Sequence, residues 1–105
     1  MTPTLAYQYI ARRMRELGYQ DRYHLRMRHL IIARNQIRTL KGYGSYFILV
    51  HEPEGVRITS QRGIFDLNFN AANELQYEHH GKIKILNKLK RPAHVKFIQV
   101  IPYKK

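Results

Sequence analysis

Basic and apolar side chains alternate over residues 22–28, RYHLRMR, and this alternation is the main sequence evidence for the fold. The apolar members are Tyr23, Leu25 and Met27. The basic members are Arg22, His24, Arg26 and Arg28. A period of two residues is typical of a strand with one face buried and the other in water. The stretch therefore predicts a strand whose basic side chains all project from one face.

A helix is the alternative for residues 22–41. It would begin at an Asp21 cap and end near Gly42, because four apolar residues also fit helical spacing. These four are Leu30, Ala33, Ile37 and Leu40. Such a helix would place Arg22, Arg26 and Arg34 within its apolar arc. We therefore favour the strand, although the sequence leaves both structures open.

Upstream of this stretch, residues 2–18 are typical of an amphipathic helix. Thr2 supplies an N-cap hydroxyl, Pro3 suits the first helical position, and Gly18 suits the C-terminal cap. The expected apolar stripe comprises Ala6, Tyr7, Ile10, Met14 and Leu17. We expect the helix to pack through this stripe.

Downstream, short apolar or alternating runs predict further strands. They are residues 46–51, 56–59, 64–69, 75–79, 82–86 and 95–103. Turns are expected at residues 42–44, 53–55 and 61–63, and a hairpin turn at His80-Gly81. Pro102 suits an edge strand or the end of a strand. The short connections favour antiparallel pairing. The expected fold class is α+β, β-dominant, with one N-terminal amphipathic helix packed on a curved antiparallel sheet or partial barrel.

Length and composition limit the class of protein. The 105 residues fit a single domain, residues 1–105, with enough chain to bury a core. Because there is no cysteine, a disulfide scaffold, a thiolate metal site and a cysteine nucleophile are excluded. No apolar run is long enough to cross a membrane, and no signal-peptide pattern is visible. We therefore expect a virion or a cytoplasmic particle as the location, and neither secretion nor a membrane.

The charge of the chain is high and unevenly distributed. Nineteen Lys and Arg residues face seven Asp and Glu residues, which gives a net charge of +12. The net charge is +7 over residues 1–44, −3 over residues 45–81 and +8 over residues 82–105. The fold can therefore gather the two basic ends into one electropositive face, which attracts nucleic acid or an acidic protein.

Two basic clusters are the candidate residues for binding an anion or a partner. The first comprises Arg12, Arg13, Arg15, Arg22, Arg26 and Arg28. The second comprises Lys82, Lys84, Lys88, Lys90 and Arg91. Alternate strand residues recur about every 6.7 Å, which is close to two phosphate steps of about 3.4 Å along one DNA strand. The alternative interpretations are a solvated strand face for the first cluster and an aggregation-blocking charged edge for the second.

Residues for metal binding or catalysis form no recognisable pattern. His79 and His80 are neighbours and point to opposite faces of a strand, so they cannot chelate one ion together. We expect no metal, no cofactor, no small-molecule substrate and no catalytic residues. One enzymatic class remains as an alternative, the small basic ribonucleases of the toxin type. The candidate residues for that activity are Arg57, Arg62, His94 and Tyr103.

The sequence thus predicts a non-enzymatic, small basic structural or interaction subunit of a large macromolecular assembly. Its expected partners are other protein subunits of the assembly or the phosphate backbone of nucleic acid. A virion head or tail is favoured over a ribonucleoprotein particle, because ribosomal-type proteins commonly carry longer basic tails. We expect neighbouring subunits to hold both chain ends, Thr2 and Lys104-Lys105. The main alternative is a free-standing nucleic-acid-binding module.

Overall fold

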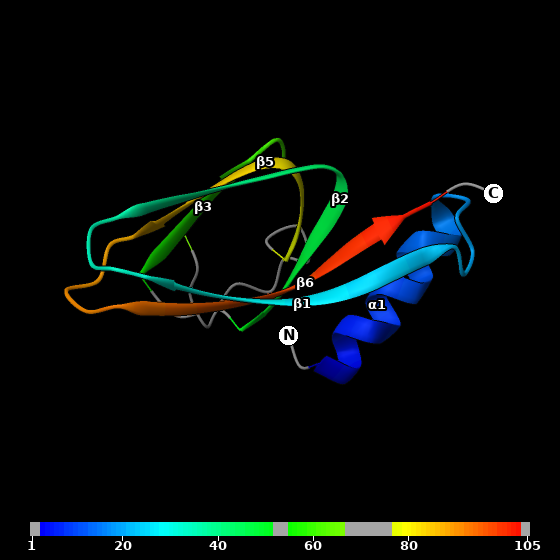
Figure 1. Ribbon diagram of the computed structural model, residues 1–105, viewed down its shortest axis with the longest axis horizontal. Helices are drawn as coiled ribbons and strands as arrows, with labels where there is room; N and C mark the ends of the chain where they lie inside the picture. The colour runs from blue at the N-terminus through cyan, green and yellow to red at the C-terminus, as the bar shows by residue number, and fades with distance from the viewer. Residues whose placement is uncertain (1–2, 52–54, 67–76, 104–105) are drawn as a thin grey trace.

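The chain forms a helix followed by strands (Figure 1). The computed structural model describes residues 3–51, 55–66 and 77–103, and only the backbone of Tyr43 and His51. The described elements are α1 (Pro3–Glu16), β1 (Tyr23–Ile32), β2 (Ile37–His51), β3 (Val56–Ser60), β4 (Gly63–Asp66), β5 (Glu78–Asn87) and β6 (Ala93–Pro102). The strands form one antiparallel sheet in the order β1-β6-β2-β5-β3-β4, and this sheet is not closed. The class is therefore α+β with β structure dominant, as the sequence predicted.

The sheet buries apolar side chains on both faces. The face that we call the inner face carries Leu30, Ile32, Leu40, Phe47, Leu49, Val56, Ile58, Ile83, Ile85, Ala93, Val95 and Phe97. The opposite face, which we call the helix face, carries Ile48, Ile98 and Val100. Helix α1 packs on these three residues through Ala6, Ile10 and Met14. Because side chains alternate along a strand, β2 and β6 contribute to both apolar clusters.

Strand β2 bends, and the curvature of the sheet follows from this bend. Its first part, residues 37–42, pairs with β5, whereas residues 46–48 pair with β5 on one edge and β6 on the other. The register with β5 shifts between Gly42 and Tyr46, and Gly44 has a φ of 80°. The Phe47 ring occupies the position that a β-carbon on Gly42 would take. The bend therefore needs Gly44 for its backbone conformation and Gly42 for space.

Two turns expected from glycine are strand residues instead. Residues 42–44 lie within β2, and His80-Gly81 lies within β5, which runs without interruption from Glu78 to Asn87. Gly81 has a φ of 74° and faces Gly42 across the β2–β5 ladder. The glycines therefore serve the irregular pairing of two strands and not a hairpin turn. Residues 53–54, 67–69 and 75–76 of the expected turns and strands lie outside the described residues, as do Thr2 and Lys104-Lys105.

Two expectations at the ends of elements had different outcomes. Strand β6 lies between β1 and β2, so Pro102 stands at the end of a strand and not at an edge of the sheet. Pro102 is tolerated there because the pairing of β6 with β2 ends at Val100, so the missing N–H leaves no ladder bond unmade. In the helix, Tyr7 is 48% exposed and Leu17 is 39% exposed. Leu17 follows Glu16, the last helical residue, and therefore does not continue the buried stripe.

Replacing Gly42 by alanine tests the origin of the bend. The new methyl group would collide with the buried Phe47 ring, and overpacking of this kind typically costs about 1–3 kcal/mol of unfolding free energy. Urea unfolding followed by circular dichroism measures the loss. In a Phe47→Leu background the same substitution should cost less, because the ring that it meets is gone. An equal cost in both backgrounds would show that Phe47 is not the cause.

Candidate docking surface on strand β1

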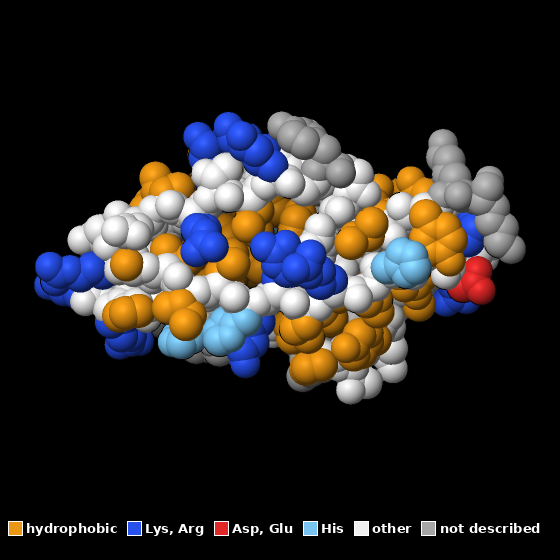
Figure 2. Space-filling model, viewed as in Figure 1, with side chains coloured by type: hydrophobic (Ala, Val, Ile, Leu, Met, Phe, Trp, Pro, Cys, Tyr) orange, Lys and Arg blue, Asp and Glu red, His pale blue; other side chains and the backbone are white. Residues whose placement is uncertain are grey.

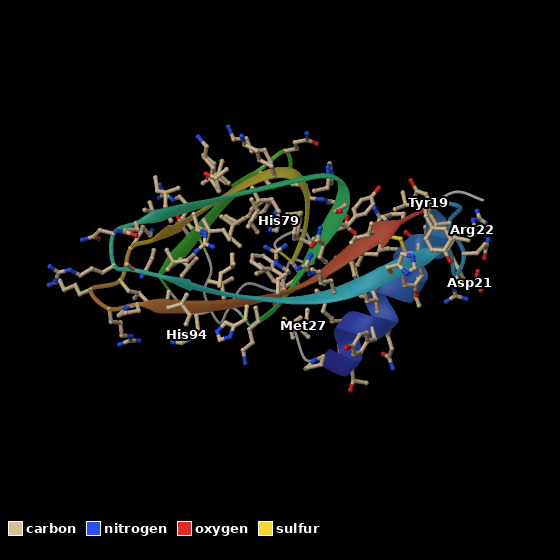
Figure 3. All side chains as sticks on the ribbon, viewed as in Figure 1. Tyr19, Asp21, Arg22, Met27, His79 and His94 are labelled. Carbon is tan, nitrogen blue, oxygen red and sulfur yellow. The ribbon has the colours of Figure 1, made fainter. Side chains whose placement is uncertain are left out.

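Strand β1 exposes apolar side chains on the helix face of the sheet. Leu25 and Met27 stand opposite Val100 and Ile98 of β6, yet they are 43% and 53% exposed. Ile31, further along the same face, is 56% exposed. Helix α1 packs mainly on β2 and β6, and so it leaves this row open to solvent (Figure 1). Figure 3 shows Met27 on the outer side of β1.

On the inner face, the same strand carries arginines. Arg26 and Arg28 continue the row that begins with buried Leu30, past the end of the apolar core. Arg28 donates from Nη1 to Oε1 of Gln99 at 3.1 Å, and Arg26 stands directly opposite Gln99. This bond holds the guanidinium of half-buried Arg28 in place, whereas Arg26 is exposed. We call Leu25, Arg26, Met27, Arg28 and Ile31 together the β1 surface.

The backbone edge of β1 is also free, because β1 is the outermost strand of the sheet. The amide N–H of Tyr103 donates to the carbonyl of Arg22 at 3.0 Å. Hydrogen-bonded pairs alternate along an antiparallel ladder, so the even-numbered residues of β1 bond to β6. The N–H and C=O groups that point to the free edge then belong to Leu25, Met27, His29 and Ile31, whereas the N–H of Tyr23 donates to the carbonyl of Asp21.

Acidic side chains of the described residues neutralise only some of the cations. Asp66 accepts from Nε of Arg57 at 2.9 Å and from Lys88 at 3.0 Å, and these bonds lower the pKa of Asp66 to about 2. Glu16 and Glu78 form the other described ion pairs. The cations engaged in these three groups are Arg12, Arg13, Arg57, Arg62 and Lys88. Among the described residues, Arg26 and Arg28 have no acidic partner.

Glu78 is the centre of a buried polar cluster that joins α1 to the sheet. Its side chain is 1% exposed and accepts hydrogen bonds from Tyr9 at 2.9 Å, from Arg13 at 2.8 Å and from Arg62. Burial alone would raise the pKa of Glu78, but the bonds from Arg13 and Tyr9 and the charge of Arg62 outweigh burial and lower the pKa. Burial and the bond to Glu78 raise the pKa of Tyr9 to about 12. The cluster is thus a structural ion pair network.

The helix arginines of the first predicted cluster do not extend the β1 surface. Arg13 bonds both Glu78 and Glu16, and Arg12 lies 3.7 Å from Glu16. Arg15 is exposed, and its Nε donates to a carbonyl one turn back in its own helix. Arg13 is therefore engaged within the fold by two carboxylates. No local pattern in the sequence indicates that Glu78 is buried beside it.

Arg22 also differs from the expectation. Its Nη2 donates to the carbonyl of Gly18 at 2.9 Å, so the side chain turns back towards the end of α1. Figure 3 shows it beside Tyr19 and Asp21, at the end of the molecule. Of the basic row expected along residues 22–28, Arg26 and Arg28 are therefore the arginines that remain on the strand face.

The second predicted cluster lies elsewhere on the sheet. Lys82 and Lys84 are exposed on the helix face of β5, whereas Ile83 and Ile85 are buried on the inner face, as the alternation predicted. Lys90 and Arg91 are exposed in the connection to β6, and Lys88 bonds Asp66. Strands β6 and β2 separate β5 from β1, and Lys82 and Lys84 lie on the face opposite to Arg26 and Arg28. The expected single electropositive face is therefore divided, and Figure 2 shows Lys and Arg side chains in separate groups.

Two contacts of histidine side chains could not be predicted from the sequence. His29 of β1 and His94 of β6 lie 3.0 Å apart between Nε2 and Nδ1, on the exposed side of the sheet. His79 is fully buried, and its Nδ1 lies 2.7 Å from Oγ of Ser60. Residues 65 apart in sequence form the first pair, so no local spacing marks it. Within residues 3–51, 55–66 and 77–103, no three potential ligands gather at a metal-binding distance.

The four candidate ribonuclease residues do not meet. Arg57 bonds Asp66 next to β4, and Arg62 bonds buried Glu78. His94 pairs with His29, and the Tyr103 ring stacks on His24 at 4.8 Å between centroids. His94 and Tyr103 stand at opposite ends of β6, and Arg57 and Arg62 lie on β3 or in the turn after it, so this set does not form one acid–base site. A separate pocket of about 200 Å³ lies near the β2 bend. It is lined by residues 19, 44–46, 61, 80 and 81, none of which is Asp, Glu, Lys or Arg.

Comparison of the chain with protein-family models, with curated proteins and with solved structures finds no match. The described part of the chain contains no helix with the length and apolar character needed to cross a membrane. Function must therefore be inferred from the geometry of the surface itself.

Replacing Glu78 by glutamine tests the buried cluster. The change leaves Arg13 and Arg62 without a carboxylate, and breaking a buried pair costs about 3 kcal/mol at neutral pH. A lowered folded-state pKa means that Glu78 stabilises the protein above its unfolded value of 4.5 and loses that effect as the pH falls. The variant should therefore lose less stability than the parent protein between about pH 7 and about pH 3.

Urea unfolding at a series of pH values measures both effects. Asp66→Asn is the matched control, because Asp66 also binds two cations but lies in solvent. It should change stability at neutral pH much less than Glu78→Gln does. Equal losses in the two variants would contradict the structural role of Glu78.

Proposed function

We propose that the chain is a non-enzymatic interaction subunit of a larger assembly, and that it docks onto an acidic protein partner through the β1 surface. The observation that carries the proposal is that one outer strand combines three features. It has exposed apolar side chains, a free backbone edge, and two arginines that have no acidic partner among the described residues. An exposed strand of this kind is a site for pairing with another chain. A protein partner satisfies all three features together.

A protein partner fits the β1 surface better than nucleic acid does. Arginine presents a planar fork that binds carboxylate and phosphate oxygens equally well. Leu25 and Met27, however, alternate with the arginines, and Ile31 lies further along the strand. These apolar side chains offer phosphate no hydrogen bond. Apolar side chains of a protein partner would be buried against them. Carboxylates between apolar residues are therefore the chemistry that matches this strand.

A virion head or tail is the assembly that we favour over a ribonucleoprotein particle. All described Lys and Arg residues of the C-terminal third lie on β5, on β6 or in the connection between them. A subunit of this form contacts its neighbours through the fold itself. Particles purified from the native source should contain the chain in fixed ratio to a particle protein. Recovery only in the particle-free fraction would contradict this assignment.

Nucleic-acid binding is the second candidate function, and a separate observation favours it. Lys41 of β2 and Lys82 of β5 stand directly opposite each other, with Lys84 two residues along, on the helix face. Like charges placed opposite each other across a ladder are unfavourable until an anion binds between them. No described acidic residue pairs with any of these lysines. A phosphate backbone is a suitable anion for this lysine group.

Two double charge reversals distinguish the candidate functions. Arg26→Glu with Arg28→Glu alters the β1 surface, and Lys82→Glu with Lys84→Glu alters the lysine group with the same change in net charge. Binding of fluorescent poly-L-glutamate at low salt should weaken at least about tenfold in the arginine variant, as expected for two reversed charge-assisted contacts. The lysine variant should retain binding, because its net charge is the same but its β1 surface is intact.

Equal weakening by the two variants would contradict docking at β1, since only net charge would then matter. Binding of RNA or DNA that is lost in the lysine variant alone, without binding of polyglutamate, would establish the second candidate instead. Shortening of the RNA during the same titration would contradict a non-enzymatic function. Thermal unfolding of each variant confirms that the fold is retained.

A further inference from the structure

We infer that the acidic partner binds by strand addition: an extended segment pairs antiparallel with β1 and alternates carboxylate with apolar side chains. The inference rests on the proposed function and specifies the chemistry of its partner. Strand addition uses main-chain hydrogen bonds for affinity and alternate side chains for specificity. Both requirements can be examined residue by residue along β1.

The main-chain requirement is met over the length of β1. The strand has ten residues, and the N–H and C=O groups of Leu25, Met27, His29 and Ile31 point away from β6. Residues 24–27 are exposed one after another, so neither α1 nor another described element covers this edge. The outer strand at the other end of the sheet, β4, has four residues within the described part of the chain. The long edge is therefore the one that offers an extended segment a continuous ladder.

The side-chain requirement follows from the same alternation. In the ladder with an added strand, Met27 and His29 would form hydrogen-bonded pairs, and Arg26 and Arg28 would stand at the positions between them. At those positions the opposing α-carbons are only about 4.5 Å apart, so side chains meet most closely there. Carboxylates two residues apart in the partner would thus meet Arg26 and Arg28. Apolar residues between them would cover Met27 and Leu25.

A second copy of this chain does not fit the edge. In an antiparallel pair of two β1 strands centred on Met27, Arg26 of one copy would stand opposite Arg28 of the other. Like charges directly opposite each other are destabilising. No register of two β1 strands supplies a carboxylate to these arginines, because residues 23–32 contain no Asp or Glu. The charge pattern therefore selects an acidic partner over self-association.

A synthetic peptide tests the inference directly. Val-Thr-Val-Glu-Val-Glu-Val, labelled at its N-terminus, places its two glutamates opposite Arg28 and Arg26 when it pairs antiparallel with residues 25–31. The control peptide has the same composition with the two glutamates adjacent. We expect fluorescence anisotropy to show tighter binding of the alternating peptide than of the control. Equal affinity for both peptides would overturn strand addition.

Backbone methylation separates strand addition from simple charge attraction. Methyl groups on the nitrogens of the third and fifth residues block the N–H groups that would face Met27 and His29. Loss of two hydrogen bonds should weaken binding by about tenfold or more. Methyl groups on the two glutamate nitrogens point away from β1 and should have little effect. The same response to both methylated peptides would overturn the inference.

Two protein variants complete the test. Met27→Pro removes an N–H that points to the free edge and spares the ladder with β6, so it should abolish peptide binding without unfolding the protein. Arg26→Glu with Arg28→Glu should lose the glutamate peptide and bind the peptide in which lysine replaces glutamate. Retention of the glutamate peptide by either variant would overturn the inference. A dimer of the unmodified chain that Met27→Pro converts to monomer would overturn the choice of partner.

Failure of this inference and failure of the proposed function give different results. If polyglutamate binds and the arginine variant loses it, while alternation and methylation have no effect, docking at β1 stands and strand addition is wrong. If neither polyglutamate nor any acidic peptide binds, the proposed function is wrong as well.

Discussion

The continuity of β2 through its bend is the constraint on which the rest of the structure depends. Because β2 pairs with β5 along its first part and with both β5 and β6 further on, it connects the two sides of the curved sheet. Phe47 on the inner face and Ile48 on the helix face are consecutive residues that belong to different apolar clusters. Gly42 and Gly44 make this arrangement possible, one by its small volume and the other by its backbone conformation. The position of β1 at the outside of the sheet follows from this order of strands.

The distribution of charge follows from where the acidic residues are used. Glu78 holds Arg13 of the helix and Arg62 of the β3–β4 turn, so one buried carboxylate fixes three segments together. Asp66 similarly engages Arg57 and Lys88. The described acids that form ion pairs thus stabilise the fold and leave β1 cationic. A strongly positive net charge is in this way concentrated at places where a partner can neutralise it.

Local patterns predicted the elements well, and long-range pairings could not be predicted. The helix beginning at Pro3, the strand containing Leu25 and Met27, and the alternation of Lys82 with Ile83 all depend on residues a few positions apart. The predicted hairpin turn at Gly81 is wrong because the role of Gly81 depends on Gly42, which lies across the ladder and far away in sequence. Likewise, the burial of Glu78 depends on Arg13 and Tyr9, more than sixty residues away. For the candidate site, the sequence identified Arg26 and Arg28, but strand order alone shows that their strand is outermost.

The unequal lengths of the two outer strands have a consequence for stoichiometry. Strand β1 has ten residues and β4 has four, and Asp66 at the end of β4 is already bound to two cations. Once a segment covers β1, the described residues offer no second edge of comparable length on which growth could continue. The proposed pairing then favours one segment per chain over extension into fibres.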